Sequence, residues 1–245
     1  MKKYRIELTM ACLLLVCFYL LSRQAAVISV NQAEQGTQKA AGPLILVDAG
    51  HGGSDPGMIG VGGLEEKGIN LSISLLLRDT LEKSGYSVIM TREEDKGLYD
   101  SSAANKKAQD MQRRIAMIRE HMPVLSVSIH QNSYHDAGVH GPQVFYYESS
   151  VEGKKLAEAV QSSLNDLLEV DRPREVKGNT SYYLLKRSSG TLVIVECGFL
   201  SNTEEAEKLM KEVPKLKWTL PVGVISLLVT IFGFGWTILR LVGIL

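Results

Sequence analysis

Short apolar runs alternate with helical patterns along most of this chain, and that alternation restricts the folds open to it. Runs rich in Val, Ile and Tyr indicate strands over residues 44–50, 87–92, 124–130, 143–148, 182–186 and 191–198. Apolar residues recur at helical spacing over residues 70–83, 103–120 and 153–168. This order predicts an α/β fold, a single domain with a twisted, mostly parallel sheet of about six strands flanked by helices.

Side chains that can carry chemistry stand at the ends of three predicted strands. His51 follows the first strand, in the glycine-rich stretch VDAGHGGSDPG, His130 ends the third, and Glu196 lies near the end of the last. Ligands of open α/β sheets gather at the carboxyl ends of the strands, so we expect these residues to converge on one edge. The glycines around His51 let the backbone and a substrate come close together.

Histidines at two strand ends leave two interpretations open, a metal site or two structural side chains. A catalytic zinc takes three protein ligands and keeps one position open, and two histidines with a glutamate are one known set. The carboxylates that follow His51 and are candidates for the third ligand are Asp55, Glu65 and Glu66. The alternative interpretation of a glutamate here is a solvated side chain in the first turn of the next helix, where its negative charge complements the helix N-terminus.

The other histidines have ordinary structural explanations. His121 ends a predicted helix, where it interacts favourably with the helix dipole, and His135 and His140 lie in a polar loop. Glu196 differs because it interrupts the apolar run TLVIVECGF, and a buried carboxylate is costly without a partner. A glutamate that faces a water at a metal would explain this position. Partial desolvation then predicts a raised pKa, which suits general acid–base catalysis.

Four motifs together resemble one enzyme family. VDAGHGGSDPG, GLEEKGIN, SVSIHQN and VECGFLSN occur in the order found in the zinc-dependent N-acetylmuramoyl-L-alanine amidases, the Amidase_3 family. The resemblance covers residues 44–212 and implies a catalytic domain of that extent. It implies hydrolysis of the amide bond between N-acetylmuramic acid and L-alanine, with the glycan strands and stem peptides of peptidoglycan as partners.

The resemblance also implies the roles of the site residues. His51, Glu66 and His130 match the ligands of one zinc ion, and Glu196 matches the catalytic glutamate. Glu66 is preferred over its neighbour because the ligand of the family directly precedes a lysine. Ala49 departs from the pattern, since the family usually has proline there, and alanine removes a fixed φ.

A second set of motifs is similar to the germination-specific amidases of spore-forming bacteria, the CwlD type. These motifs are MTREEDKGLY, KKAQDMQRRIAMI, VFYYES and SYYLLKRS. The similarity implies muramic δ-lactam formation in the spore cortex, a role in germination, and a deacetylase or lipoprotein as partner. The alternatives are a general vegetative autolysin, a zinc peptidase that acts on stem peptides, and an inactive wall-binding membrane protein.

Three further residues are candidates for substrate binding, Asn132, Arg92 and Arg113. The two arginines would bind acidic groups of the stem peptide or glycan, and surface ion pairing is their alternative. After Glu212 the chain becomes apolar, whereas the family continues with an amphipathic helix that covers the sheet. The sequence therefore leaves open which element covers the sheet there.

Both ends of the chain carry membrane signals. A basic start followed by an uncharged run from Leu8 to Leu21 predicts that residues 1–23 are an export signal retained as an anchor, with a cleaved signal as the alternative. Residues 24–43 are predicted to be a linker. Residues 213–245 are predicted to be a second membrane helix or an altered terminus, with a buried terminal element as the alternative.

These signals predict an exported protein, anchored on the outer face of the cytoplasmic membrane. If the protein is specific to sporulation, that place is the envelope space between forespore and mother cell. The formal net charge is +0, with 27 Lys and Arg against 27 Asp and Glu, which gives no basis for a nucleic-acid partner. Cys197 is the one cysteine outside the N-terminal apolar run, so no disulfide framework is expected.

Overall fold

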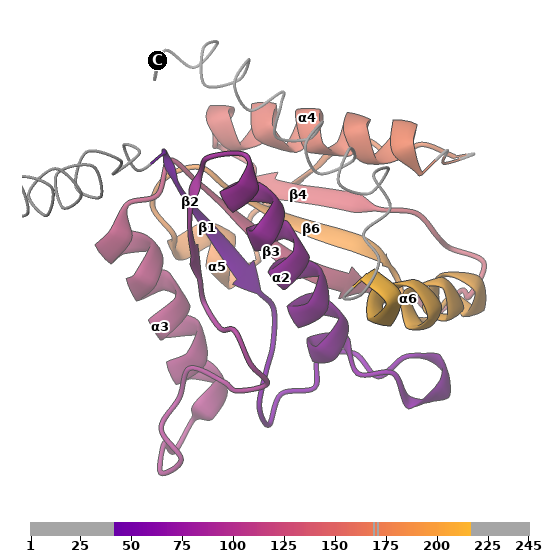
Figure 1. Cartoon of the computed structure of the whole chain (residues 1–245), viewed down its shortest axis with the longest axis horizontal. Coiled ribbons are helices and arrows are strands. Elements are labelled where there is room, and N and C mark those ends of the chain that lie inside the picture. The colour runs from indigo at the N-terminus through magenta and orange to yellow at the C-terminus, as the bar shows by residue number, and fades with distance from the viewer. Residues whose placement is uncertain (1–41, 169, 171, 217–245) are drawn as a thin grey trace, which may run out of the picture. The chain divides into compact units, whose positions relative to one another are not determined.

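A six-stranded sheet forms the centre of the computed structural model, which describes residues 42–168, 170 and 172–216 (Figure 1). The strands are β1 (Leu44–Ala49), β2 (Ser87–Met90), β3 (Leu125–Asn132), β4 (Gln143–Tyr147), β5 (Lys177–Asn179) and β6 (Leu192–Phe199). Their order is β2-β1-β3-β6-β4-β5, and every neighbouring pair is parallel except β4 with β6. The predicted α/β fold with a mostly parallel sheet is confirmed.

Helices cover both faces of this sheet. On one face, α2 (Glu66–Lys83) and α4 (Val151–Leu167) pack against β-strand residues that include Ile45 and Val47. On the other face, α3 (Lys106–His121) and α5 (Tyr183–Arg187) pack against residues that include Leu46. Alternate residues of β1 therefore enter opposite cores, as a strand covered on both sides requires. Each such buried aliphatic side chain contributes about 1.5–3 kcal/mol.

The helix α6 (Thr203–Leu216) comes directly after β6. It contacts α2 and β6 (Figure 1) and buries Ala206. The Glu205 carboxylate accepts hydrogen bonds from the backbone N–H groups of Gly141 and Phe199. The described helix begins before Glu212 and extends into the predicted apolar segment as far as Leu216, and the rest of that segment lies outside the described residues.

The sequence predicts a strand over residues 182–186, and that prediction is wrong. The structure forms α5 there, after a turn in which the Asn179 side chain accepts the N–H groups of Ser181 and Tyr182. A short apolar run does not distinguish a strand from a buried helix. The sixth strand is β5 instead, a KGN segment without apolar pattern that pairs only with β4.

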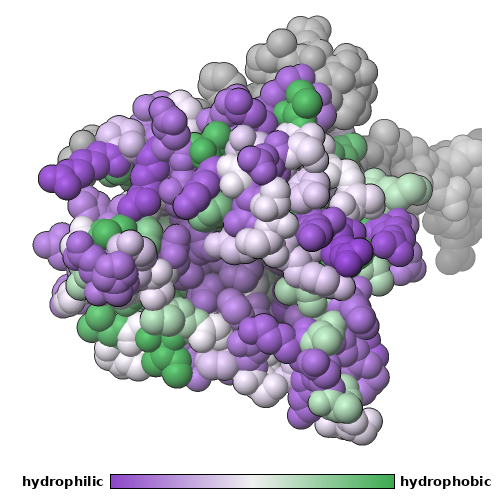
Figure 2. Space-filling model, turned by 180° about the vertical axis from the view of Figure 1, so that it is seen from behind, coloured by the Kyte–Doolittle hydropathy of each residue, from purple (hydrophilic) through white to green (hydrophobic). Residues whose placement is uncertain are grey.

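Within residues 42–168, 170 and 172–216, no helix is long and apolar enough to cross a membrane. The predicted anchor over residues 1–23, the linker up to residue 41 and the segment 217–245 lie outside the described residues. From behind, the surface is mostly hydrophilic with small hydrophobic patches between hydrophilic areas (Figure 2).

Candidate metal centre

Two buried arginines hold the turn that follows β1. Arg92 donates hydrogen bonds to the carbonyl oxygens of Ala49 and Gly50, and Arg114 donates to those of Ala49 and His51. His51 has a φ of 61°, which is costly for a residue with a side chain. The hydrogen bonds to three successive carbonyls stabilise this conformation and so orient the His51 ring.

A buried ion pair fixes Arg114 in turn. Arg114 donates to the carboxylate of Asp48 at the end of β1, and to Asp110 one helical turn away at 2.6 Å. The Asp48 carboxylate also accepts hydrogen bonds from Thr91 at 2.8 Å and Ser128 at 2.5 Å. Burial raises the pKa of Asp48, but Arg114 and these hydroxyl groups outweigh it and lower the pKa to about 2.

His51, Glu66 and His130 converge at the carboxyl edge of the sheet. Their candidate ligand atoms all lie within 4.8 Å of one another. His51 Nε2 lies 3.2 Å from Glu66 Oε2, and His130 Nδ1 lies 3.0 Å from Glu66 Oε1. Two imidazoles and one carboxylate are a donor set that fits a catalytic zinc ion with one open position. The structure therefore brings the three predicted ligands together.

Backbone and amide groups fix the Glu66 carboxylate from outside the metal centre. It accepts hydrogen bonds from the N–H groups of Met58 at 2.8 Å and Gln131 at 3.1 Å, and from the Asn70 amide at 3.0 Å. Burial raises the pKa of Glu66, but the hydrogen bonds with His130 and His51 outweigh it and hold the pKa well below its usual value. Glu66 is therefore an ionised carboxylate with a fixed orientation, as a metal ligand needs.

Asp55 orients the first histidine. Its Oδ2 lies 2.9 Å from His51 Nδ1, on the side of the ring away from Glu66, and its Oδ1 accepts the N–H of Gly57. Burial lowers the pKa of His51, but hydrogen bonds with Glu66 and Asp55 raise it overall. A carboxylate at Nδ1 leaves Nε2 to face the metal centre. Asp55, a candidate third ligand in the sequence, thus lies behind the centre.

Two glycines of the first motif make room for the ligand side chains. A Cβ on Gly50 would lie 2.3 Å from the His130 ring, and a Cβ on Gly57 would lie 2.5 Å from Glu66 Oε2. Gly57 also has a φ of 68°, which a side chain rarely adopts. Gly50 and Gly57 therefore admit the candidate ligand side chains, and the substrate access expected beside His51 stays a prediction.

Glu196 lies beside the metal centre on the neighbouring strand. It is paired with His130 in the β3–β6 register and is 8% exposed. Its Oε2 has no hydrogen-bond partner among the described residues. Burial is the main reason that its pKa rises to about 7, and Glu66 adds to the rise while His130 and His51 oppose it. The raised pKa agrees with the sequence-based expectation.

The cavity at this edge has a volume of about 370 Å³ and is lined by His51, His130 and Glu196. A larger cavity of about 470 Å³ borders α6 and contains none of these side chains. Cys197 lines that larger cavity, and burial raises the pKa of its thiol to about 12. The thiol therefore stays protonated near neutral pH, and the candidate ligands and Glu196 lie in the smaller cavity.

The predicted substrate-binding residues have other partners. The Arg92 guanidinium is buried and donates to backbone carbonyls, so neither substrate binding nor surface ion pairing describes it. Arg113 is exposed and pairs with Asp100 at 2.6 Å. It therefore makes the surface ion pair that the sequence left open as the alternative to substrate binding. The Asn132 side chain accepts the N–H of Ser133 at 2.7 Å.

Ala49 donates its N–H to Thr91 Oγ1 at 3.2 Å, a bond that proline cannot make.

Sequence analysis missed Arg114 and Asn70. Arg114 stands four residues before Ile118, on the helical side that packs against the sheet, and Asn70 stands four residues after Glu66. A charged side chain on an apolar helix face was the available signal for the first. The spacing of four from a candidate ligand was the signal for the second.

Comparisons with known proteins agree with this geometry. A family model described as N-acetylmuramoyl-L-alanine amidase matches residues 45–218. The germination-specific N-acetylmuramoyl-L-alanine amidase of Bacillus subtilis is 36% identical over 174 residues, 70% of this chain and 73% of the relative. The amidase LytC of the same organism is 31% identical over 193 residues, which cover 78% of this chain and 36% of LytC.

Solved structures of amidases share the fold. The CwlD amidase of Clostridioides difficile, in complex with the GerS lipoprotein, matches with a TM-score of 0.72 and 33% identity, over 81% of this chain and 99% of that chain. The amidase AmiC2 of Nostoc punctiforme matches with a TM-score of 0.64 and 27% identity, over 80% and 98%. The similarity thus covers nearly the whole of each solved domain.

We predict that Arg114→Ala destabilises the fold by about 3–5 kcal/mol, because it leaves the Asp48 carboxylate buried without its cation. Urea unfolding of the wild type and the variant measures this. Arg113→Ala, which removes the adjacent exposed arginine, is the matched control and should change stability by less than about 0.5 kcal/mol. Equal losses in the two variants would contradict a specific role of the buried pair.

Glu196→Gln should stabilise the metal-free protein at high pH only. The pKa of Glu196 is about 7 in the folded state and ordinarily 4.5. Its contribution to the free energy of unfolding is therefore fully present below pH 4.5 and is lost as the pH rises through 7. The variant lacks this loss, so we expect it to be about 1–3 kcal/mol more stable than wild type at pH 8 and close to it at pH 5. Urea unfolding in the presence of a chelator measures both. Glu65→Gln, at an exposed neighbour of the site, is the matched control, and an equal gain at pH 8 in both variants would contradict the role of burial at Glu196.

Proposed function

This chain belongs to the N-acetylmuramoyl-L-alanine amidase family, and we propose that it uses one zinc ion, held by His51, Glu66 and His130, to hydrolyse the bond between N-acetylmuramic acid and L-alanine in peptidoglycan. The observation that supports the zinc site best is the convergence of the three ligand atoms within 4.8 Å, beside an unpaired buried carboxyl group. A zinc ion supplies Lewis-acid activation of a water and of the scissile carbonyl.

Glu196 moves the proton in this reaction. Its free Oε2 accepts a proton from the attacking water, and the carboxyl group then donates that proton to the amine of the departing L-alanine. A pKa of about 7 suits both steps, since the carboxylate form is available and the acid form is accessible near neutral pH. Glu196 is paired with His130 of β3 and lines the same cavity as His51, so its carboxyl group is held beside the proposed zinc ligands.

The surroundings of the zinc ligands preorganise the site. Asp55 fixes the ring of His51, and three N–H groups fix the carboxylate of Glu66. Arg114 and Arg92 fix the backbone that carries His51. Few ligand rotations then have to be restricted when the metal binds, which favours tight binding and a constant geometry.

The similarity to the germination-specific amidase of Bacillus subtilis supports a role in making muramic δ-lactam in the spore cortex. The GerS complex of the Clostridioides difficile amidase supports a lipoprotein partner, and a deacetylase would complete lactam formation. Deletion of the gene in its native host, followed by mass analysis of cortex muropeptides, tests the role. Loss of δ-lactam supports it, whereas an unchanged cortex with altered vegetative autolysis would favour a general autolysin.

Export and anchoring by residues 1–23 fit this substrate, because peptidoglycan lies outside the cytoplasmic membrane. The basic start followed by the apolar run of Leu8–Leu21 supports retention at the outer face of that membrane. Protease treatment of intact protoplasts measures the placement. Degradation of the catalytic domain, with a cytoplasmic marker left intact, is the expected result, and protection of both would contradict it.

Glu196→Gln should reduce kcat by about 10²–10⁴-fold while the zinc content stays the same, because the variant keeps the ligands and loses the proton carrier. Liquid chromatography with mass spectrometry of digested muropeptides measures the rate and identifies the products. Glycans freed of peptide indicate an amidase, and shortened stems indicate a peptidase. Glu65→Gln is the control and should retain activity. A Glu196→Gln variant as fast as wild type would refute the proton-transfer role.

Chelation should abolish cleavage, and added zinc should restore it. His130→Ala removes one of three ligands, so we expect zinc content by atomic absorption to fall to a small fraction of wild type. His121→Ala changes a histidine at the end of α3, away from the centre, and should retain one zinc ion per chain. Retention of zinc by His130→Ala would contradict the proposed ligand set.

A further inference from the structure

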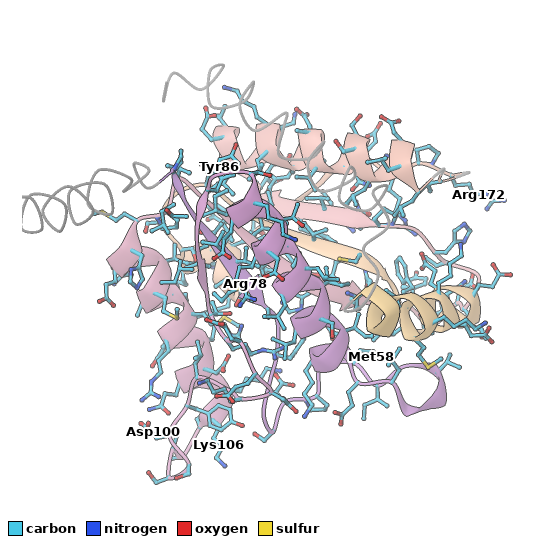
Figure 3. All side chains as sticks on the ribbon, in the orientation of Figure 1. Met58, Arg78, Tyr86, Asp100, Lys106 and Arg172 are labelled. Atoms are coloured by element: carbon cyan, nitrogen blue, oxygen red, sulfur yellow. The ribbon has the colours of Figure 1, made fainter. Side chains whose placement is uncertain are left out.

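The cavity at the metal centre continues along α3. Its lining includes His130 and Glu196 at one end and Lys107 at the other. A smaller cavity of about 250 Å³ shares Lys107 with it and ends at Lys106 and Tyr99. The two cavities together form a groove from the metal centre to the first turn of α3, and Figure 3 shows Lys106 at this end of the helix.

The first turn of α3 has an unusual charge. A helix N-terminus stabilises negative side chains, yet this turn contains Lys106 and Lys107 and no acidic residue. The helix is capped conventionally, since the Asn105 side chain accepts the N–H of Ala108 at 2.9 Å. Two cations at the positive end of a helix oppose its stability, and departures of this kind are typical of functional positions.

The two acidic residues that line both cavities, Asp55 and Asp110, are already engaged. Asp55 binds His51 and the N–H of Gly57. Asp110 binds Arg114 and the N–H of Leu98. These internal contacts satisfy both carboxylates, so the groove does not neutralise its lysines through hydrogen bonds.

The two lysines keep donors for a ligand. Lys107 Nζ lies 3.9 Å from Asp55 Oδ2, which is beyond hydrogen-bond distance. Lys106 Nζ lies 5.5 Å above the centre of the Tyr99 ring. Within the described part of the chain, neither ammonium group has a hydrogen-bond acceptor, and both face the groove that holds the unpaired, 8% exposed Glu196.

The other side of the cavity, at the start of α5, is lined by aromatic side chains, and the Arg187 guanidinium lies 5.7 Å from the centre of the Tyr183 ring. Tyr182 and Tyr183 line it there, and both are partly exposed. The Tyr182 ring packs on Phe145 at 5.2 Å between ring centres. Ring faces of this kind suit an uncharged sugar, whereas the lysines suit an anion. The two ends of the cavity therefore differ in their lining, with tyrosines at one end and a lysine at the other.

We propose that Lys106 and Lys107 bind the α-carboxylate of the D-glutamate that follows L-alanine in the stem peptide, and that they make the enzyme prefer stems in which this carboxylate is free over stems in which it is amidated. This inference rests on the proposed function. The D-glutamate lies about 7 Å beyond the scissile amide, because each residue spans about 3.3–3.6 Å. Asp55 Oδ2 lies 2.9 Å from His51 Nδ1 and 3.9 Å from Lys107 Nζ, so Lys107 Nζ lies within about 7 Å of the His51 ring, a span of the length that separates these two groups of the substrate.

The test compares two synthetic disaccharide peptides that differ only in carrying D-glutamate or D-isoglutamine at the second position. The full chain, loaded with zinc, is assayed as wild type, as Lys106→Ala/Lys107→Ala and as Lys106→Arg/Lys107→Arg. Lys154→Ala is the matched control, because Lys154 on α4 is also exposed and also makes only a long ion pair, 3.7 Å from Glu158.

We expect the double alanine variant to lose about 5- to 20-fold in kcat/KM on the D-glutamate substrate, mainly through KM, and to change less than about twofold on the amidated one. The arginine variant should recover most of the preference, and zinc content should be unchanged throughout. Equal losses on both substrates, or no loss on either, would overturn the lysine assignment while leaving the amidase function intact. A wild type that cleaves neither substrate would instead refute the proposed function, and the lysine assignment with it.

Discussion

The buried ion pair between Asp48 and Arg114 connects the sheet to the metal centre. Asp48 is the penultimate residue of β1, and Arg114 reaches it from α3, so the pair joins two elements that are far apart in sequence. The same guanidinium donates to the carbonyl of His51. A shift of α3 against the sheet would therefore move a metal ligand. An unpaired buried charge is far more costly than a paired one. The ion pair therefore strongly favours this one position of α3 against the sheet.

The site concentrates features that oppose folding. His51 has a left-handed backbone, Glu66 is a buried carboxylate, and Glu196 is a buried carboxyl group with an unpaired oxygen. The two apolar clusters on either side of the sheet offset these terms. Sites that bind a metal and move a proton commonly trade stability in this way, because a satisfied carboxylate would have no capacity left for a substrate.

Sequence reasoning located the site because the chemistry of α/β sheets lies at strand ends. His51, His130 and Glu196 could be placed from the apolar runs before them. The wrong prediction of a strand over residues 182–186 did not change the predicted location of the site. The strand found in its place, β5, lies at the far edge of the sheet from β1. The arginines could not be assigned, because their partners are backbone carbonyls that only the folded turn brings within reach.

One side of α3 connects the candidate metal centre with the proposed substrate groove. Lys107, Asp110 and Arg114 follow each other at intervals of three and four residues, so they share a side of the helix and line one cavity. Asp110 binds Arg114, and Arg114 binds His51. An anion bound at Lys107 would therefore contact the same helix that orients His51, a candidate metal ligand. Since α3 packs on the sheet through Ile115 and Ile118, it holds Lys107 and Arg114 at fixed positions relative to His51 and Glu196.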